Sequence, residues 1–376
     1  MSTNPRIYLD HNATVPLIPA ARDAITAALP ALGNPSSIHA EGRRARDLVE
    51  RARNQVASLL GRPREQVVFT SGGAEANALG VAALARVVEA RGGARVVASA
   101  AIDHPSLRGA VAALVARGWQ HRPLAVTPAG EVVADELVGV GLLAFAAVNH
   151  ELGTLADHPA LAAAARRAGA LVHVDAVQAA GKRELGAIDA DALAISGHKL
   201  GGPPGVGALA IALDDGLPLV DGGHQERGRR PGTENVLGIV GFGAAAAAVD
   251  LAAWAAVTAL GERFEARLQA LDGVRIHGAG APRVGGTINA GFAGALGESI
   301  LVALDLAGVA VSTGAACTSG SVQPSAVLLA LGLTAERARE AVRFSLGVTT
   351  TAAECDEVIA RLGPIVERAR VRGRRA

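Results

Sequence analysis

The chain has 376 residues, of which 50% are hydrophobic and 19% charged, and its formal net charge is +1. A chain of this length can bury a large core and form two domains. It contains no uncharged run of about 18 residues that would span a membrane. The small net charge argues against a dedicated nucleic-acid surface. Because Met1 to Asp10 lack an apolar signal-peptide core and two cysteines cannot form a disulfide framework, we expect a cytoplasmic protein.

Helix and strand patterns alternate from about residue 37 to 212. A first long helix is expected from a cap at Ser36 and Ser37 to Leu60, where Gly61 ends it. Short apolar runs typical of buried strands follow at 67–70, 95–98, 142–146, 171–174 and 192–195. Helical stretches separate these runs, which predicts an α/β fold with a mostly parallel central sheet and helices on both faces.

A different pattern follows an Ala-rich stretch that predicts one helix over 241–271. Strands are expected at 274–277, 286–290 and 309–312, together with helices at 296–307 and from 352 onwards. We therefore predict a large domain of residues 1–250 and a smaller α+β domain of residues 251–376. Residues 1–20 are expected to pack on the smaller domain.

The glycine-rich turn 196–205 carries a single lysine, Lys199, directly after the strand 192–195. An amine held in a dry site beside His198 would lose part of its proton affinity and could form a Schiff base with an aldehyde. Asp175 ends the preceding strand, and consecutive strand ends of a parallel sheet open into the same crevice. Pyridoxal phosphate (PLP) needs this pair: a lysine for its aldehyde and an acid for its pyridine nitrogen.

Further polar residues are expected at the same edge of the sheet. The turn 70–77 follows a strand and opens a helix, which is typical of a phosphate site and also of an ordinary strand–helix connection. His104 and Asn149 lie at two other strand ends, where His104 could stack on a flat ring or serve only in packing. His150 and Glu151 lack the second histidine of a zinc-binding helix, so no metal site is expected.

Cys317 lies in a loop of small residues, 314–321. A packing cysteine usually has bulky apolar neighbours, and an exposed thiol oxidises, so the pattern favours a nucleophile. Cys355 lies in a helical pattern with acidic neighbours, which favours a structural role. Arg343 is a charge in a strand otherwise suited to burial, so its partner is either a substrate carboxylate or an internal acid.

Together and in order, these segments resemble the cysteine desulfurases of the NifS/IscS type, in the class V aminotransferase group of fold-type I PLP enzymes. The resemblance covers nearly the whole chain, and the loop around Cys317 looks like the group I form. It is carried by residues 8–14, 33–39, 70–73, 173–178, 196–199, 225–235, 316–321 and 342–347.

The resemblance implies roles for individual residues. Cys317, Lys199 and His104 would be catalytic, with Lys199 bound to the cofactor's aldehyde and with Lys199 and His104 as proton carriers. The residues implied to hold the cofactor are Lys199, Asp175, Gln178, His104, Gly73, Ala74, Asn149, Ser196, His198 and, in a homodimer, Thr233 of the partner subunit. The residues implied to hold the substrate carboxylate are Asn149, Arg343 and Asn12. Ala74 stands where many members have threonine, which removes one phosphate-binding hydroxyl.

The implied function is removal of sulfur from L-cysteine, which gives L-alanine and a persulfide on Cys317. An acceptor protein of iron–sulfur cluster assembly or of thiolation would receive that sulfur. The alternatives are a selenocysteine lyase or another class V lyase or aminotransferase, although simple transamination needs no thiol. A non-catalytic binding protein is disfavoured because Lys199, Asp175 and Cys317 are all present.

Overall fold

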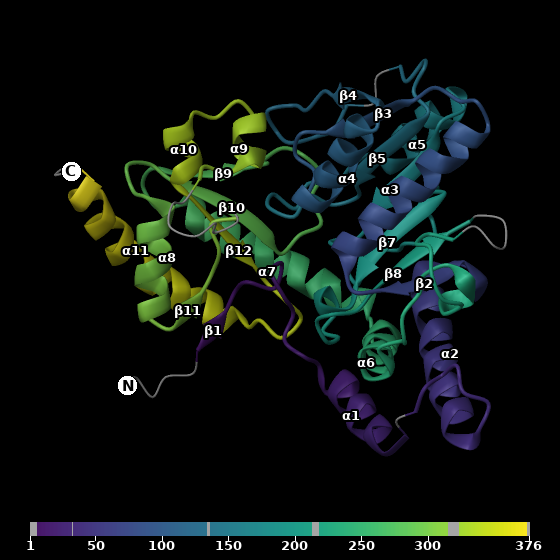
Figure 1. Ribbon diagram of the computed structural model, residues 1–376. Helices are drawn as coiled ribbons and strands as arrows, with labels where there is room; N and C mark the ends of the chain where they lie inside the picture. Colours follow the sequence, from purple (N-terminus) through teal and green to yellow (C-terminus); the bar gives the residue numbers. More distant parts are fainter. Residues whose placement is uncertain (1–5, 32, 134–135, 213–217, 315–322, 374–376) are drawn as a thin grey trace.

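The computed structural model describes residues 6–31, 33–133, 136–212, 218–314 and 323–373. Two sheets dominate these residues, and Figure 1 shows the larger one among α1 to α6 and the smaller one among α7 to α11. Each sheet packs against hydrophobic side chains of its own helices.

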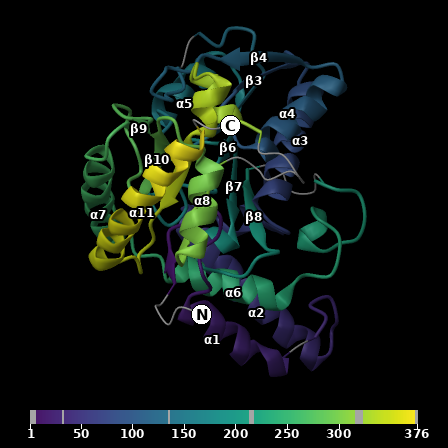
Figure 2. The same ribbon diagram turned by 90° about the vertical axis from the view of Figure 1, so that its left-hand side faces the viewer.

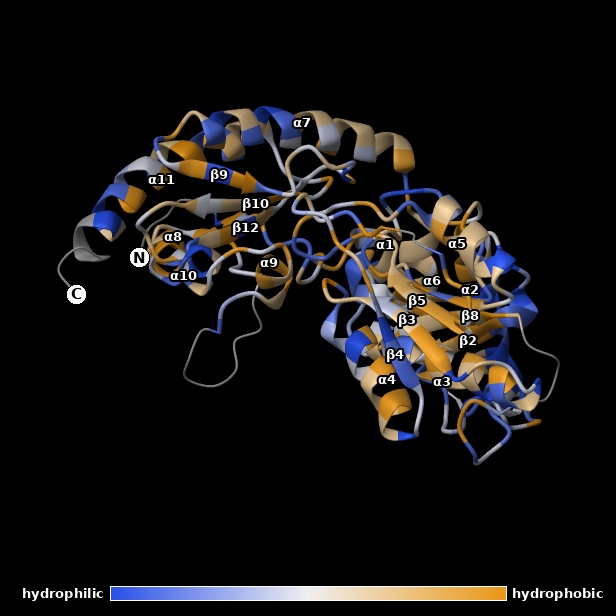
Figure 3. Cartoon of the chain, turned by 90° about the horizontal axis from the view of Figure 1, so that it is seen from above, coloured by the Kyte–Doolittle hydropathy of each residue, from blue (hydrophilic) through white to orange (hydrophobic). Residues whose placement is uncertain are grey.

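The larger sheet has seven strands in the order β2-β8-β7-β6-β5-β3-β4. Their bounds are β2 Val67–Thr70, β3 Val96–Ala100, β4 Gln120–Leu124, β5 Leu142–Ala146, β6 Leu171–Asp175, β7 Ala192–Ser196 and β8 Gly207–Ile211. Neighbours from β4 to β7 are parallel, whereas β8 is antiparallel to both β7 and β2. The predicted α/β fold with a mostly parallel sheet is confirmed, although the sequence analysis missed β4 and β8. The edge strand β4 is polar, as Figure 3 shows, which suits its exposed position.

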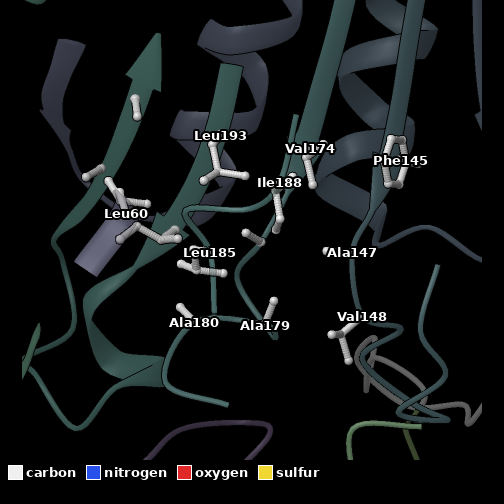
Figure 4. Close-up of a cluster of buried hydrophobic side chains, with 14 of the residues drawn as sticks. Leu60, Phe145, Ala147, Val148, Val174, Ala179, Ala180, Leu185, Ile188 and Leu193 are labelled. Carbon is white, nitrogen blue, oxygen red and sulfur yellow. The ribbon is translucent and has the colours of Figure 1, made fainter. Parts of the chain in front are cut away.

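The central strands are buried on both faces because helices cover both. On β5, Leu143 and Phe145 join one hydrophobic core, and Leu142 and Ala144 join the other. Figure 4 shows part of the first core, where Phe145 packs with side chains of the neighbouring strands. The helices on this side are α1 Pro19–Ala28, α2 Ala40–Leu60, α5 His158–Arg167 and α6 Val236–Ala247, and those on the other side are α3 Gly73–Ala90 and α4 Pro105–Ala116.

Helix α3 lies unusually close to the sheet. A Cβ atom added at Gly80 would be 2.6 Å from the ring of His173, so glycine is needed for this approach. The strand residues beneath α3 include the small side chains of Ala192 and Ala194. This packing holds the first turn of α3 beside the carboxyl ends of β6 and β7.

The smaller sheet is antiparallel, in the order β12-β10-β9. Its strands are β9 Val274–His277, β10 Thr287–Phe292 and β12 Ala341–Ser345, and its helices are α7 Leu251–Gln269, α8 Gly297–Leu306, α9 Ala326–Ala330, α10 Ala335–Arg339 and α11 Ala352–Gly373. Helices α8 and α11 lie side by side, as Figure 2 shows. The strand β1 (Ile7–Tyr8) pairs with β11 (Val309–Ala310) in a separate two-stranded sheet, and Ile7 and Leu9 join the hydrophobic core of the smaller sheet. The domain boundary at residue 250 stays a prediction.

Two helix predictions need correction. The single helix expected over 241–271 is wrong, because α6 ends at Ala247 and α7 begins at Leu251 after a bend of 75°. Asp250 caps α7 by accepting a hydrogen bond from the backbone N–H of Ala252 at 2.9 Å, a signal that the run of alanines obscured. The first long helix begins after His39 and not at the serines, although it ends at Gly61 as predicted.

No single helix in the described ranges is long and apolar enough to cross a membrane. In the part of the chain that the structure describes, one pair of helices, α6 and α7, reaches that length and composition when taken together across their bend.

Candidate active site

A cavity of about 700 Å³ lies where the carboxyl ends of the large sheet approach β12. Its walls come from strand ends, from the first turn of α3, from the segment before α1 and from both flanks of residues 315–322. Of the residues predicted for the site, the cavity is lined by Asn12, Gly73, Ala74, His104, Asp175, Gln178, Ser196, His198, Lys199 and Arg343. One concave site therefore collects side chains from distant parts of the sequence.

Lys199 follows β7 in a single helical turn, Gly197–Lys199, and is half-buried. Its Nζ donates hydrogen bonds to the carbonyl oxygens of Asn12 and Ala13, the latter at 2.8 Å. Burial lowers the pKa of Lys199 to about 8, and the positive charge of Arg343 acts in the same direction. A large fraction of this amine is therefore neutral and nucleophilic slightly above neutral pH.

Asp175 is the last residue of β6, and its carboxylate is buried. One oxygen accepts a hydrogen bond from the backbone N–H of Val177 at 3.0 Å, and the other accepts one from Nδ2 of Asn77 at 2.7 Å. Burial raises the pKa of Asp175, whereas both hydrogen bonds stabilise its charged form. An acid held in this way can pair with a cationic nitrogen.

Gln178 and Asn12 are held by a second lysine, which the sequence analysis did not identify. Nζ of Lys182 donates to Oε1 of Gln178 at 2.9 Å and to Oδ1 of Asn12 at 2.8 Å. It also lies 5.3 Å from the ring centroid of Trp254. Burial lowers the pKa of Lys182 to about 7. The side-chain nitrogen of Gln178 donates to the backbone oxygen of Asn12 at 2.9 Å, which fixes the orientation of the amide.

The first turn of α3 meets Ser196 and His198 at the other end of the cavity. A Cβ atom added at Gly73 would lie 2.6 Å from the side chain of Val177, so glycine is required for this approach. Burial lowers the pKa of His198 to about 4, and its Nδ1 lies 3.1 Å from Oγ1 of Thr14. Hydroxyl, imidazole and helix N-terminal N–H groups together suit a phosphate. With Lys199 and Asp175 in the same cavity, the donor set fits PLP.

His104 is the N-cap residue of α4 and lines the cavity. Its ring makes an edge contact with the ring of His150, with 4.9 Å between centroids. Burial lowers the pKa of His104, so the neutral imidazole predominates at neutral pH.

Arg343 lies in β12 and faces both the cavity and an internal acid. Its guanidinium donates to Oδ1 of Asp10 at 2.8 Å and to the backbone oxygen of His150 at 3.0 Å. Within the described residues, its Nε atom is buried without a hydrogen-bond partner. An internal acid and a substrate carboxylate, the two partners expected from the sequence, are therefore compatible. Arg343 can bond to Asp10 and still has an N–H group without a partner among the described residues.

Two predicted site residues that the structure describes do not line the cavity, and a third cannot be placed among the described residues. The Asn149 side chain is buried in its own turn, where it donates to the carbonyl of Ile102 at 2.8 Å and accepts from the N–H groups of Glu151 and Leu152. Thr233 is exposed elsewhere on the same chain. Cys317 lies outside the described residues, and its flanks Gly314 and 323–327 form part of the cavity wall. The roles assigned to these three residues stay predictions.

Glu151 and Asn77 were missed by the sequence analysis. The Glu151 carboxylate is buried and accepts a hydrogen bond from Oγ of Ser325 at 2.6 Å, and a Cβ atom added at Gly314 would lie 2.7 Å from it. Burial raises the pKa of Glu151. The available signal for Glu151 was its position two residues after Asn149, just beyond a strand end, whereas Asn77 was hidden among the small residues of α3.

Comparisons with known proteins agree with this geometry. The family model for class-V aminotransferases matches residues 7–358. A cysteine desulfurase from a Nostoc species is 39% identical over 97% of this chain and 94% of its own length. The cysteine desulfurase IscS from Dictyoglomus turgidum is 35% identical over 97% of this chain and 95% of its own length. Among solved structures, a NifS-like protein superimposes with a TM-score of 0.87 at 29% identity, covering 96% of this chain and all of that one.

Proposed function

The chain belongs to the class-V aminotransferase family and is a PLP-dependent cysteine desulfurase, and we propose that it transfers the sulfur of L-cysteine to Cys317. The supporting observation is that Lys199 and Asp175 converge on one cavity whose wall includes the residues on both sides of 315–322. A thiol in that segment is close in sequence to both flanks of the wall.

We assign the cofactor to the donor set described above. When bound, PLP supplies an electron-withdrawing ring that stabilises negative charge on the substrate. Lys199 would hold its aldehyde, Asp175 its pyridine nitrogen and Gln178 its ring hydroxyl. Ser196, His198 and the first turn of α3 would hold its phosphate.

Lys199 is the base that we propose for removing the α-proton of cysteine. Its lowered pKa supports this role, because the amine can be neutral and still regain a proton when alanine is completed. His104 is the second proton carrier, and the edge contact with His150 helps to fix its ring at the cavity wall.

The substrate carboxylate would bind to Arg343, with Asn12 beside it. The guanidinium is already desolvated and oriented by Asp10, so little side-chain entropy is lost when an anion binds. Asn149 would contribute only if its amide left the turn in which it is bonded, which makes it the weaker candidate.

Sulfur transfer needs a thiolate that can reach the substrate. In the proposed step, the Cys317 thiolate attacks the substrate sulfur, an S–S bond forms as the C–S bond breaks, and protons from Lys199 or His104 complete alanine. Cys355 is unsuited to this step, because it is buried in α11 and burial raises its pKa to about 11.

The persulfide would pass to an acceptor protein of iron–sulfur cluster assembly or of thiolation, in a cytoplasm that keeps the thiol reduced. We further propose a homodimer in which Thr233 of the partner subunit reaches the phosphate. The exposure of Thr233, away from the cavity of its own chain, supports this arrangement. Sedimentation should show two chains per particle, and a fully active monomer would contradict the shared site.

The test of the proposal compares the two cysteines. Cys317→Ala should keep the visible absorbance of the bound cofactor and its change on adding L-cysteine, while losing alanine formation. Cys355→Ala is the matched control and should retain alanine formation. If Cys317→Ala releases alanine at the parent rate, Cys317 is not the sulfur acceptor.

A further inference from the structure

Asn77 lies at the centre of a buried hydrogen-bond network beside the cavity. It belongs to α3 and is 1% exposed. Its Nδ2 atom is 2.7 Å from Oδ2 of Asp175 and 3.0 Å from Oγ of Ser106, and its Oδ1 is 3.0 Å from Nε2 of His173. A single amide therefore links the strand end that carries Asp175 to the start of α4.

The chemistry of the partners fixes the direction of each hydrogen bond. A carboxylate can only accept, so the Asn77 nitrogen faces Asp175 and the Asn77 oxygen accepts from His173. The second N–H of the amide is donated to Ser106, which leaves the Ser106 hydroxyl hydrogen free for another acceptor. Burial lowers the pKa of His173 to about 3, which agrees with a neutral ring that donates through Nε2.

That other acceptor is His104. Its Nδ1 lies 2.8 Å from Oγ of Ser106 and 3.2 Å from the backbone nitrogen of Ser106. A backbone N–H can only donate, so Nδ1 accepts from the backbone and from the hydroxyl alike. The ring proton of neutral His104 must then be on Nε2, for which no hydrogen bond is found among the described residues.

We propose that Asn77 and Ser106 are positioning residues that hold His104 in the Nε2–H tautomer and orient Asp175 through the same amide. The inference rests on the proposed role of His104 as a proton carrier. It assigns the two proton carriers different tasks. In this tautomer Nδ1 already accepts hydrogen bonds and Nε2 already carries the proton, so neutral His104 cannot take up the α-proton and Lys199 takes it. His104 presents its Nε2–H to the cavity as a hydrogen-bond donor.

Several charges face His104 from the surrounding elements. Besides burial, Lys199 and Arg108 lower the pKa of His104 and Asp175 raises it, while the ring of His150 touches its edge. Donation by Ser106 stabilises the neutral ring and also lowers this pKa. Removing the hydroxyl should therefore raise the pKa of His104 and allow the Nδ1–H tautomer.

The test is nitrogen NMR of the full chain labelled with ¹⁵N-histidine, recorded with and without PLP, with the His104 signals identified by their loss in His104→Asn. The parent chain should show the Nε2–H tautomer alone in both states. Ser106→Ala should show both tautomers, and Ser106→Thr should restore the single one. Asn77→Ala should show partial mixing, because the hydroxyl of Ser106 loses the donor that holds it.

Ser99→Ala is the matched control, because Oγ of Ser99 makes the same kind of bond to Nε2 of His121 at 2.9 Å. It should change the signals of His121 and leave those of His104 as they are. A protonated Nδ1 in the parent chain, or an unchanged tautomer in Ser106→Ala, would overturn the inference. Because the cofactor-free chain reports the tautomer, this result is independent of whether Cys317 accepts sulfur.

Discussion

On one wall of the cavity the residues lie at or shortly after the ends of strands of the large sheet, whereas the other wall joins segments that lie far apart in the chain. The first, the strand-end wall, consists of Gly73, Asp175, Ser196 and Lys199. The second, the long-range wall, consists of Asn12, Glu151, Ser325 and Arg343. The position of the first wall, which we propose for the cofactor, thus follows from local strand–turn patterns, even though Lys199 and Asp175 also bond to distant residues. The second wall, which we propose for the substrate, depends on pairings between distant segments.

Substituting Lys199 in the strand-end wall should have the largest effect on activity, because it removes the amine that we propose binds the aldehyde of PLP and takes the α-proton. Lys199→Ala should lower kcat by at least about 10³-fold. It should also abolish the bond to PLP that borohydride reduction traps, as measured by mass spectrometry of the digested protein. Lys182→Ala is the control, since this lysine also has a lowered pKa and also contacts Asn12, and the trapped bond should survive. Trapping on Lys182 in the parent chain would refute the assignment.

Substituting Arg343 tests the long-range wall. Arg343→Ala should lower kcat/KM for L-cysteine by about 10- to 100-fold, mostly through KM, because a hydrogen-bonded charge partner of the carboxylate is lost. Asp10→Asn removes the charge of the ion pair but keeps an oxygen that can accept from Arg343, so it should preserve the orientation of the guanidinium and leave KM nearly unchanged. If both variants lose stability and neither changes KM, Arg343 has only the structural role.

Replacing Ala74 by threonine tests whether the phosphate binds at the start of α3, in the strand-end wall. The Ala74 side chain is exposed to the cavity at the start of α3, so a threonine can be accommodated. One added phosphate hydrogen bond is worth roughly 1–2 kcal/mol, which corresponds to about 5- to 30-fold tighter binding. Ala74→Thr should slow cofactor loss on dialysis, and equal or faster loss would argue against this phosphate position.

The smallest expected effect concerns Glu151 in the long-range wall and depends on pH. Its folded pKa is raised, so the stability that it contributes is present below its unfolded pKa and is lost as pH rises through the folded value. Glu151→Gln keeps an acceptor for Ser325 and cannot ionise. The loss of Tm between weakly acidic and weakly alkaline pH should therefore be smaller in the variant. An identical pH dependence in both proteins would show that Glu151 ionises without cost.

The same contrast explains which parts of the site the sequence could predict. Lys199 and Asp175 could be predicted because Lys199 follows one apolar strand, Asp175 ends another, and parallel strands end at a common edge. Asn77 was missed because its role depends on a hydrogen bond from its side-chain amide to Asp175, which is 98 residues away in the sequence. The pairing of Arg343 with Asp10 spans 333 residues and has no local signature. Strand β8 was missed because its alanines and glycine carry little strand preference.

Whether Cys317 receives the sulfur of cysteine can be measured by mass spectrometry of the parent protein after a single turnover with limiting L-cysteine. We expect one added sulfur atom on the peptide that contains Cys317, none on the peptide that contains Cys355, and one alanine per sulfur transferred. Free sulfide with an unmodified Cys317 peptide, or sulfur on Cys355, would contradict this expectation.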